Sequence, residues 1–154
     1  MAFQLPYLRL WAAGIMDAVR RALRLNAPAQ SLGQRGEEAA ARFLQDLGYL
    51  IVARGDRGRL GEIDLVAIDG RTVVFVEVKT RAGPRAGSPA NAVDADKQRR
   101  LTRLAIGYLK RHDLLEHRAR FDIVAITWRD ETQLPIIEHI QNAFEPQGLD
   151  GMYS

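Results

Sequence analysis

Two carboxylates and one lysine lie in strand-like segments where charged side chains are unusual. Glu77 and Lys79 interrupt the β-branched and aromatic run at 73–80, and Asp64 interrupts the run at 61–68. Side chains of a strand alternate between the two faces of a sheet, so Glu77 and Lys79 project from the same face. Carboxylates beside a lysine are groups that can hold a divalent metal ion at a phosphodiester.

A short turn is expected to bring the two segments together. Asp69-Gly70 lies between them and is a strong signal for a two-residue hairpin loop. In that register position 64 stands opposite position 75, position 62 stands opposite position 77, and opposed residues share a face. We therefore expect one polar cluster at the end of the hairpin away from its turn, formed by Glu62, Asp64, Glu77 and Lys79.

Three carboxylates so close together repel one another and raise one another's pKa unless a cation neutralises them. Oxygen ligands suit Mg²⁺ or Mn²⁺, which proteins commonly hold with one or two carboxylates, water and substrate phosphate. Lys79 can hold the attacking water or a phosphate oxygen. The alternative is an edge strand whose charged side chains are merely solvated, although that interpretation does not explain the aligned Asp64.

The segment before these strands is expected to be a helix at 32–47. Ser31-x-x-Gln34 has the spacing of a capping box, and Gly48 supplies a stop. Glu37 falls within the apolar stripe, which makes it a candidate third metal ligand, or a rim glutamate bound to a nearby arginine. Glu38 is expected to face water. The expected stripe consists of Ala40, Ala41, Leu44 and Leu47.

Basic residues flank the proposed cluster. We expect residues 55–61 to form a flexible loop and residues 92–109 to form a second helix with Leu101, Leu104, Ala105 and Tyr108 on its apolar side. Gln98, at the edge of that side, can orient a water or contact DNA, or it is structural. The expected phosphate contacts are Arg54, Arg57, Arg59, Arg81, Arg85 and Lys97, although each arginine alone is more simply a solvated charge.

The whole chain has the size of one domain. Its 154 residues are 47% hydrophobic, contain no cysteine and carry a formal net charge of +3, which is weak support for a polyanionic partner. We expect residues 1–30 to form an amphipathic extension and residues 145–154 to form a flexible tail. Asp17 and nearby arginines argue against a signal peptide, and residues 5–25 can contact a membrane surface or a protein.

A family resemblance extends over most of the chain. Asp64 followed by Glu77-Val78-Lys79 resembles the signature of the PD-(D/E)XK nuclease superfamily, which includes archaeal Holliday-junction resolvases, although Ile63 replaces the proline. The pattern of the bacterial YraN family is matched in order by GEIDLVAIDG, VFVEVKTR, AVDADKQRRL, FDIVAI and HIQNAF.

The resemblance implies a restriction-endonuclease-like αβββαβ sandwich over residues 31–144, an α/β fold with helices flanking a mixed sheet. It further implies Asp64, Glu77 and Glu37 as ligands of Mg²⁺ or Mn²⁺, and Lys97-Gln98 as a polar motif beside them. We expect a cytoplasmic metal-dependent nuclease that acts on DNA or RNA, with DNA favoured. Its substrates include branched or junction DNA, for which a homodimer would present two sites. The alternatives are a nucleic-acid-binding protein that does not cut, and an adaptor that uses its amphipathic N-terminus.

Overall fold

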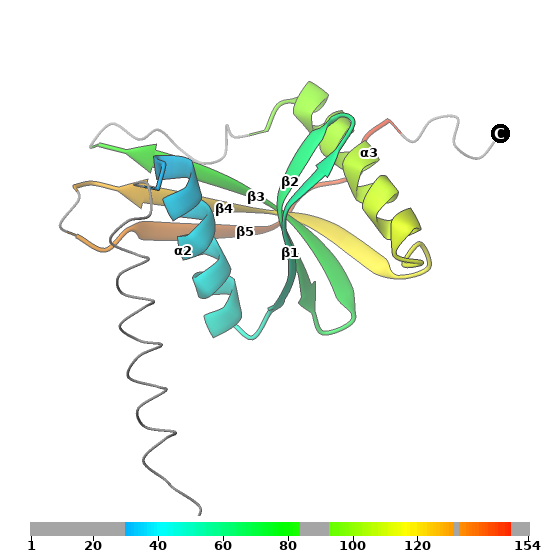
Figure 1. Ribbon diagram of the computed structural model, residues 1–154, viewed down its shortest axis with the longest axis horizontal. Helices are drawn as coiled ribbons and strands as arrows, with labels where there is room; N and C mark the ends of the chain where they lie inside the picture. Colours follow the sequence, from blue (N-terminus) through cyan, green and yellow to red (C-terminus); the bar gives the residue numbers. More distant parts are fainter. Residues whose placement is uncertain (1–29, 84–92, 131–132, 149–154) are drawn as a thin grey trace, which may run out of the picture. The chain divides into compact units, whose positions relative to one another are not determined.

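A computed structural model describes residues 30–83, 93–130 and 133–148, and Ser31–Ser154 form one compact unit. Five strands in the order β1-β2-β3-β4-β5 make one sheet (Figure 1). β3 and β4 are parallel, and the other neighbouring strands are antiparallel. The expected α/β fold with a mixed sheet is therefore confirmed. Helices α2 and α3 contribute to two separate hydrophobic clusters on opposite faces of that sheet.

α2 spans Leu32–Asp46 and begins with the expected capping box, in which the Ser31 side chain accepts from the Gln34 backbone and the Gln34 side chain accepts from the Ser31 backbone. Gly48 follows the helix with φ +92°, a conformation that favours glycine. Ala40, Ala41 and Leu44 are buried in the cluster against the sheet. Leu47, expected in the stripe, is instead exposed, because the helix ends before it.

The central hairpin is formed by β2, Gly61–Asp69, and β3, Thr72–Ala82, with Gly70-Arg71 as its loop. Val66, rather than Asp64, is therefore opposite Phe75, which shifts the expected register by two residues. Asp69 belongs to the strand and binds Arg120 at 2.9 Å, while Gly70 takes the positive φ that a tight turn needs. An even shift leaves each residue on its expected face.

β1 runs from Leu50 to Gly58, so the prediction of a flexible loop at 55–61 is wrong. Gly58 pairs with Gly61, and the two strands form a second hairpin whose tip packs on α3. A Cβ at Gly58 would lie 2.7 Å from Leu104, so glycine permits this close contact. Contact with α3 and pairing with β2 thus order a segment whose composition resembles a loop.

α3 spans Ala95–Arg111 and begins three residues later than expected, because Asp94 caps it by accepting from the Lys97 backbone at 2.8 Å. Its expected apolar side is buried against the aromatic cluster of Phe75, Phe121 and Phe144. β4, Arg118–Trp128, and β5, Ile136–Phe144, complete the sheet. The start of the expected tail is held in place, since the Gln147 backbone donates to Thr102 Oγ1 at 3.0 Å.

Candidate metal centre

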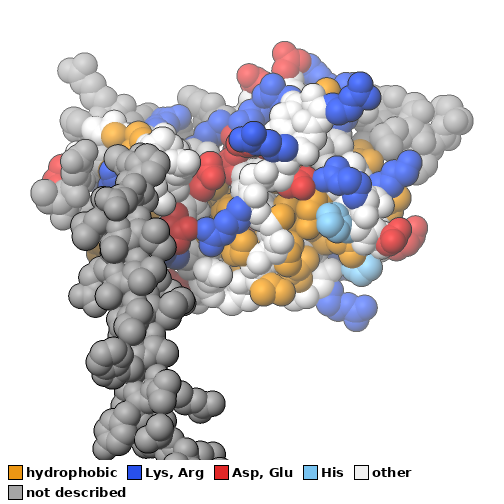
Figure 2. Space-filling view, viewed as in Figure 1, with side chains coloured by type: hydrophobic (Ala, Val, Ile, Leu, Met, Phe, Trp, Pro, Cys, Tyr) orange, Lys and Arg blue, Asp and Glu red, His pale blue; other side chains and the backbone are white. Residues whose placement is uncertain are grey.

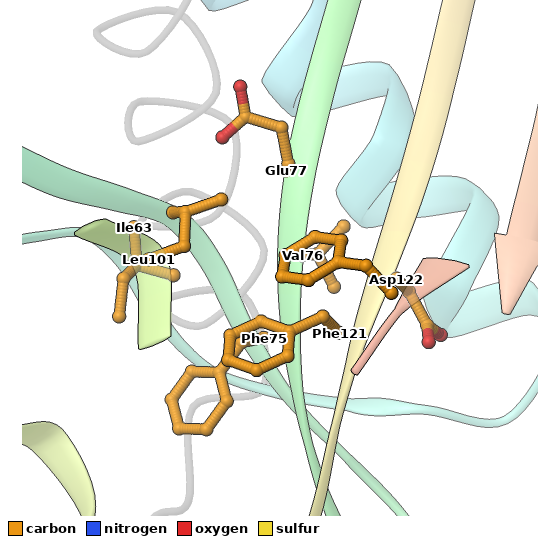
Figure 3. Close-up of a pocket in the computed structure, with 8 residues that line it drawn as sticks. Ile63, Phe75, Val76, Glu77, Leu101, Phe121 and Asp122 are labelled. Atoms are coloured by element: carbon orange, nitrogen blue, oxygen red, sulfur yellow. The ribbon is translucent and has the colours of Figure 1, made fainter. Parts of the chain in front are cut away.

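Glu77 lies in the middle of the candidate site. Its side chain is 4% exposed and projects from β3 on the side where Ile63 and Leu101 lie (Figure 3). Oε1 forms an ion pair with Lys79 Nζ at 2.9 Å and accepts a hydrogen bond from Lys97 Nζ. Oε2 is buried and has no hydrogen-bond partner among the described residues. A buried carboxylate oxygen without a partner is costly, and a bound cation would remove that cost.

Asp64 lies beside Glu77 on the neighbouring strand. The paired residues of β2 and β3 end at Leu65 and Val76, next to the two acidic residues. Asp64 Oδ2 accepts from the Val78 backbone N–H at 2.7 Å. Burial, followed by the charge of Glu77, raises the pKa of Asp64 to about 7. The charge of Glu77 acts on Asp64, so the two carboxyl groups lie close together.

Glu37 approaches this pair from α2, although that helix packs on the opposite face of the sheet, against Val74 and Val76. Burial raises the pKa of Glu37, and the charges of Glu62 and Glu77 raise it further. Glu37 is therefore close enough for the negative charges of Glu62 and Glu77 to affect its ionisation. Among the described residues, however, no three His, Cys, Asp or Glu side chains are arranged to hold one metal ion.

Several of the expected phosphate-binding arginines are engaged within the protein. Arg54 pairs with Glu38, which also binds Arg42, so Glu38 does not simply face water. Arg57 pairs with Glu62 at 2.9 Å, which draws Glu62 toward β1. Arg59 is exposed in the turn between β1 and β2, Arg81 is half-buried at the end of β3, and Arg85 lies outside the described residues.

The two polar residues at the start of α3 have different surroundings. Lys97 reaches Glu77, a contact that places this lysine beside the carboxylates. Gln98 Nε2 donates to the Val93 carbonyl oxygen at 3.1 Å, so its amide nitrogen binds the segment before the helix. The sequence did not predict the Lys97–Glu77 pair. The available signal was a lysine in the first turn of a helix, where the helix dipole disfavours a cation.

Lys and Arg side chains spread over the α3 half of the visible face, with acidic side chains among them (Figure 2).

A divalent ion fits the residues present, because Glu77 Oε2 lacks a partner among the described residues and Asp64 adds a second carboxylate. Mg²⁺ in proteins is commonly bound by one or two carboxylates, with water and phosphate completing its coordination. Glu37 supplies negative charge at the rim.

Residues 36–126 match the model of the Uncharacterised protein family UPF0102. The chain belongs to this family. It is 48% identical to a UPF0102 protein of Rhodopirellula baltica over 125 residues, 79% of this chain and 75% of that protein. It is 50% identical to one of Geobacter sulfurreducens over 114 residues, covering 74% of this chain and 88% of the relative. A Symbiobacterium thermophilum member is 52% identical over 113 residues, 73% of this chain and 95% of that protein.

The segment shared with the UPF0102 family begins within α2 and ends within β4. It includes Glu37, Asp64, Glu77, Lys79 and Lys97, so every charged side chain placed at the candidate site lies inside it. None of the helices in the described ranges combines the length and the apolar character needed to cross a membrane.

Proposed function

We propose that this chain is a metal-dependent phosphodiesterase that cleaves nucleic acid, DNA in preference to RNA, on a restriction-endonuclease-like fold of the PD-(D/E)XK superfamily. The observation that carries the proposal is the buried Glu77, whose Oε2 has no partner among the described residues and whose neighbours are Asp64 and Lys79. A solvated edge strand would not bury a carboxylate in this way, and β3 is an inner strand.

Each side chain has a distinct part in this proposal. Asp64 and Glu77 hold Mg²⁺ or Mn²⁺, with the charge of Glu37 supporting them from the rim. The metal supplies the acidity that activates water and the charge that stabilises a phosphorane-like transition state. Lys79 is 26% exposed, so its ammonium group can hold Glu77 while it also donates to a water or phosphate oxygen.

Asp64 also has to lose a proton before it can act as a ligand. Its pKa of about 7 means that the carboxyl group is partly protonated near neutral pH. Metal affinity should therefore rise with pH through this range, since only the carboxylate binds the ion.

The proposed partner is nucleic acid in the cytoplasm. Arg59, in the turn between β1 and β2, is a candidate for a phosphate contact. Arg81, at the end of β3, is a second candidate, and it already interacts within the protein. Arg54 and Arg57 would first have to exchange Glu38 and Glu62 for phosphate. A junction substrate would require a homodimer with two sites.

The test is cleavage of single-stranded, duplex, flapped and four-way-junction substrates, with Mg²⁺ or Mn²⁺ and with chelator. We expect metal-dependent cleavage that Asp64→Asn and Glu77→Gln each reduce by about a hundredfold or more, equivalent to roughly 2.7 kcal/mol in the barrier. Glu138→Gln is the matched control, because Glu138 is an exposed carboxylate on β5. Mn²⁺ binding by calorimetry should weaken in the two site variants and remain unchanged in the control.

A second candidate is a protein that binds nucleic acid without cutting it. The pairing of Glu77 with Lys79 and Lys97 favours this function, because the two lysines neutralise the carboxylate without a metal ion. Nucleic-acid binding without cleavage on any substrate, with the metal bound, would support it over the nuclease. Failure to bind the metal even with nucleic acid present would remove both the metal centre and the proposed chemistry.

A further inference from the structure

Lys97 has an unusual position for a lysine. It lies in the first turn of α3, where the positive end of the helix dipole disfavours an ammonium group. Its backbone N–H is fixed by the Asp94 cap, and its side chain reaches the buried Glu77 on β3. An unfavourable local position is thus offset by a contact between distant parts of the chain.

The charges at Glu77 are unequal. Its Oε1 forms ion pairs with two ammonium groups, those of Lys79 and Lys97, whereas one cation would neutralise one carboxylate. Lys79 follows two residues later on the same strand, so its short connection keeps it nearby. Lys97 comes instead from α3, so the tertiary fold brings its ammonium group to a carboxylate that would hold a metal ion.

The ammonium group of Lys97 is also able to leave Glu77. Its side chain is 27% exposed, which gives the ammonium group a path to solvent at the edge of the site. A lysine stem is flexible and its ammonium group is strongly hydrated, so releasing it is less costly than releasing a bidentate arginine. A divalent ion beside Asp64 and Glu77 would repel it, because like charges a few ångströms apart interact strongly where water is scarce.

We propose that Lys97 is an internal counter-ion of the Asp64–Glu77 pair that metal binding releases, and that the released ammonium group then contacts a phosphate of the nucleic acid. This inference rests on the proposed function and adds a regulatory property to it. Metal ion and nucleic acid bind cooperatively, since each favours the arrangement in which Lys97 has left Glu77. Without nucleic acid, the lysine keeps the affinity for the metal low.

The first test measures Mn²⁺ binding by calorimetry without nucleic acid. Lys97→Met should tighten the Kd by about tenfold or more, because the competing cation is gone. Lys110→Met is the matched control, since Lys110 lies on the same helix and is exposed; its Kd should equal that of the wild type. Lys97→Arg keeps a cation at the site and should bind Mn²⁺ no more tightly than the wild type, which preserves the test if Lys97→Met does not fold.

The second test measures, by fluorescence anisotropy, the affinity of each protein for a labelled DNA duplex in Ca²⁺ and in chelator. The ratio of the affinity in Ca²⁺ to the affinity in chelator reports the cooperativity. The wild type and Lys110→Met should show a large ratio, and Lys97→Met a ratio several-fold smaller. If Mn²⁺ binds all proteins but Lys97→Met matches Lys110→Met, the counter-ion role is overturned and the proposed nuclease stands. If Mn²⁺ binds none of them, the metal centre fails and this inference fails with it.

Discussion

Asp64 is a carboxyl group whose chemistry is changed by burial. Its pKa is raised from 3.8 to about 7, first by burial and then by Glu77. A carboxyl group whose folded pKa is raised contributes stability that is complete below its unfolded value and is lost as the pH rises through the folded value. The metal-free protein should therefore lose stability between about pH 4 and pH 7 on account of this residue.

We expect Asp64→Asn to flatten that part of the stability profile, because asparagine cannot ionise yet keeps an oxygen that can accept from the Val78 N–H. The measurement is the free energy of unfolding in chelator across the pH range that spans the unfolded and folded pKa values, for the wild type, Asp64→Asn and Glu138→Gln. The control should follow the wild type. Parallel profiles for all three proteins would show that Asp64 ionises at little cost in the folded state.

Adjacent glutamates on α2 differ in what they contact. Glu38 bridges Arg42 on its own helix and Arg54 on β1, and hydrogen bonds from these arginines lower its pKa. Glu37 lies instead in the negative field of Glu62 and Glu77, and burial is the main cause of its raised pKa. Helical geometry predicted the difference between them but not the Glu38 ion pairs.

Glu37→Ala should weaken Mn²⁺ binding several-fold and leave the stability of the metal-free protein unchanged or slightly increased, because it removes repulsion. Glu38→Ala should leave Mn²⁺ affinity unchanged and cost about 0.5–1 kcal/mol of stability, since these ion pairs are only partly shielded from solvent. Calorimetry measures Mn²⁺ binding, with Glu38→Ala as the control. Denaturant unfolding measures stability, with Glu37→Ala as the control. Equal effects on Mn²⁺ binding would mean that Glu37 does not act on the carboxylate pair.

Among the secondary-structure elements, α2 approaches β3 very closely at Gly36. A Cβ at this position would lie 1.7 Å from Thr80 Oγ1 and 2.8 Å from Thr80 Cβ, and Thr80 is held in a strand. The helix therefore rests almost directly on the strand that carries Glu77 and Lys79. This contact brings the first turns of α2, and with them Glu37, to the end of the sheet where the carboxylates lie.

Gly36→Ala should destabilise the protein by about 1–3 kcal/mol, although alanine favours helices by up to about 1 kcal/mol, because the added methyl group forces α2 away from β3. Gly33→Ala in the same helix is the control, since its Cβ would meet only Ser31 Oγ at 3.9 Å. This second change should be neutral or stabilising. Denaturant unfolding measures both, and similar stability changes would contradict the close contact at Gly36.

Across the molecule as a whole, buried polar side chains around Asp122 form a polar junction. This junction joins several elements on the side of the sheet away from the candidate metal centre. Asp122 is fully buried on β4 and accepts from Arg120, from the Asn142 backbone and from His139 in its N–H form. Arg120 extends the junction to Asp69 and Tyr49. Asp122 therefore has a structural role, and the junction connects the segment after α2 with β2, β4 and β5.

Local patterns in the sequence were sufficient to locate most elements and to assign the faces of their side chains. Capping residues, apolar periodicity and alternation depend on near neighbours along the chain, so they located α2 and the central strands and set Glu77 and Lys79 on one face. The faces survived the two-residue error in register because strand periodicity is two.

Which charged residues meet depends on the tertiary fold. The end of β1 contacts α3 at Leu104, and the pairs Lys97–Glu77, Arg54–Glu38 and Arg120–Asp69 join residues on different elements. An ion pair depends on distance and solvent exposure rather than on residue type alone. The sequence therefore named the carboxylates of the candidate site, while the fold selected the lysine on α3 as their partner.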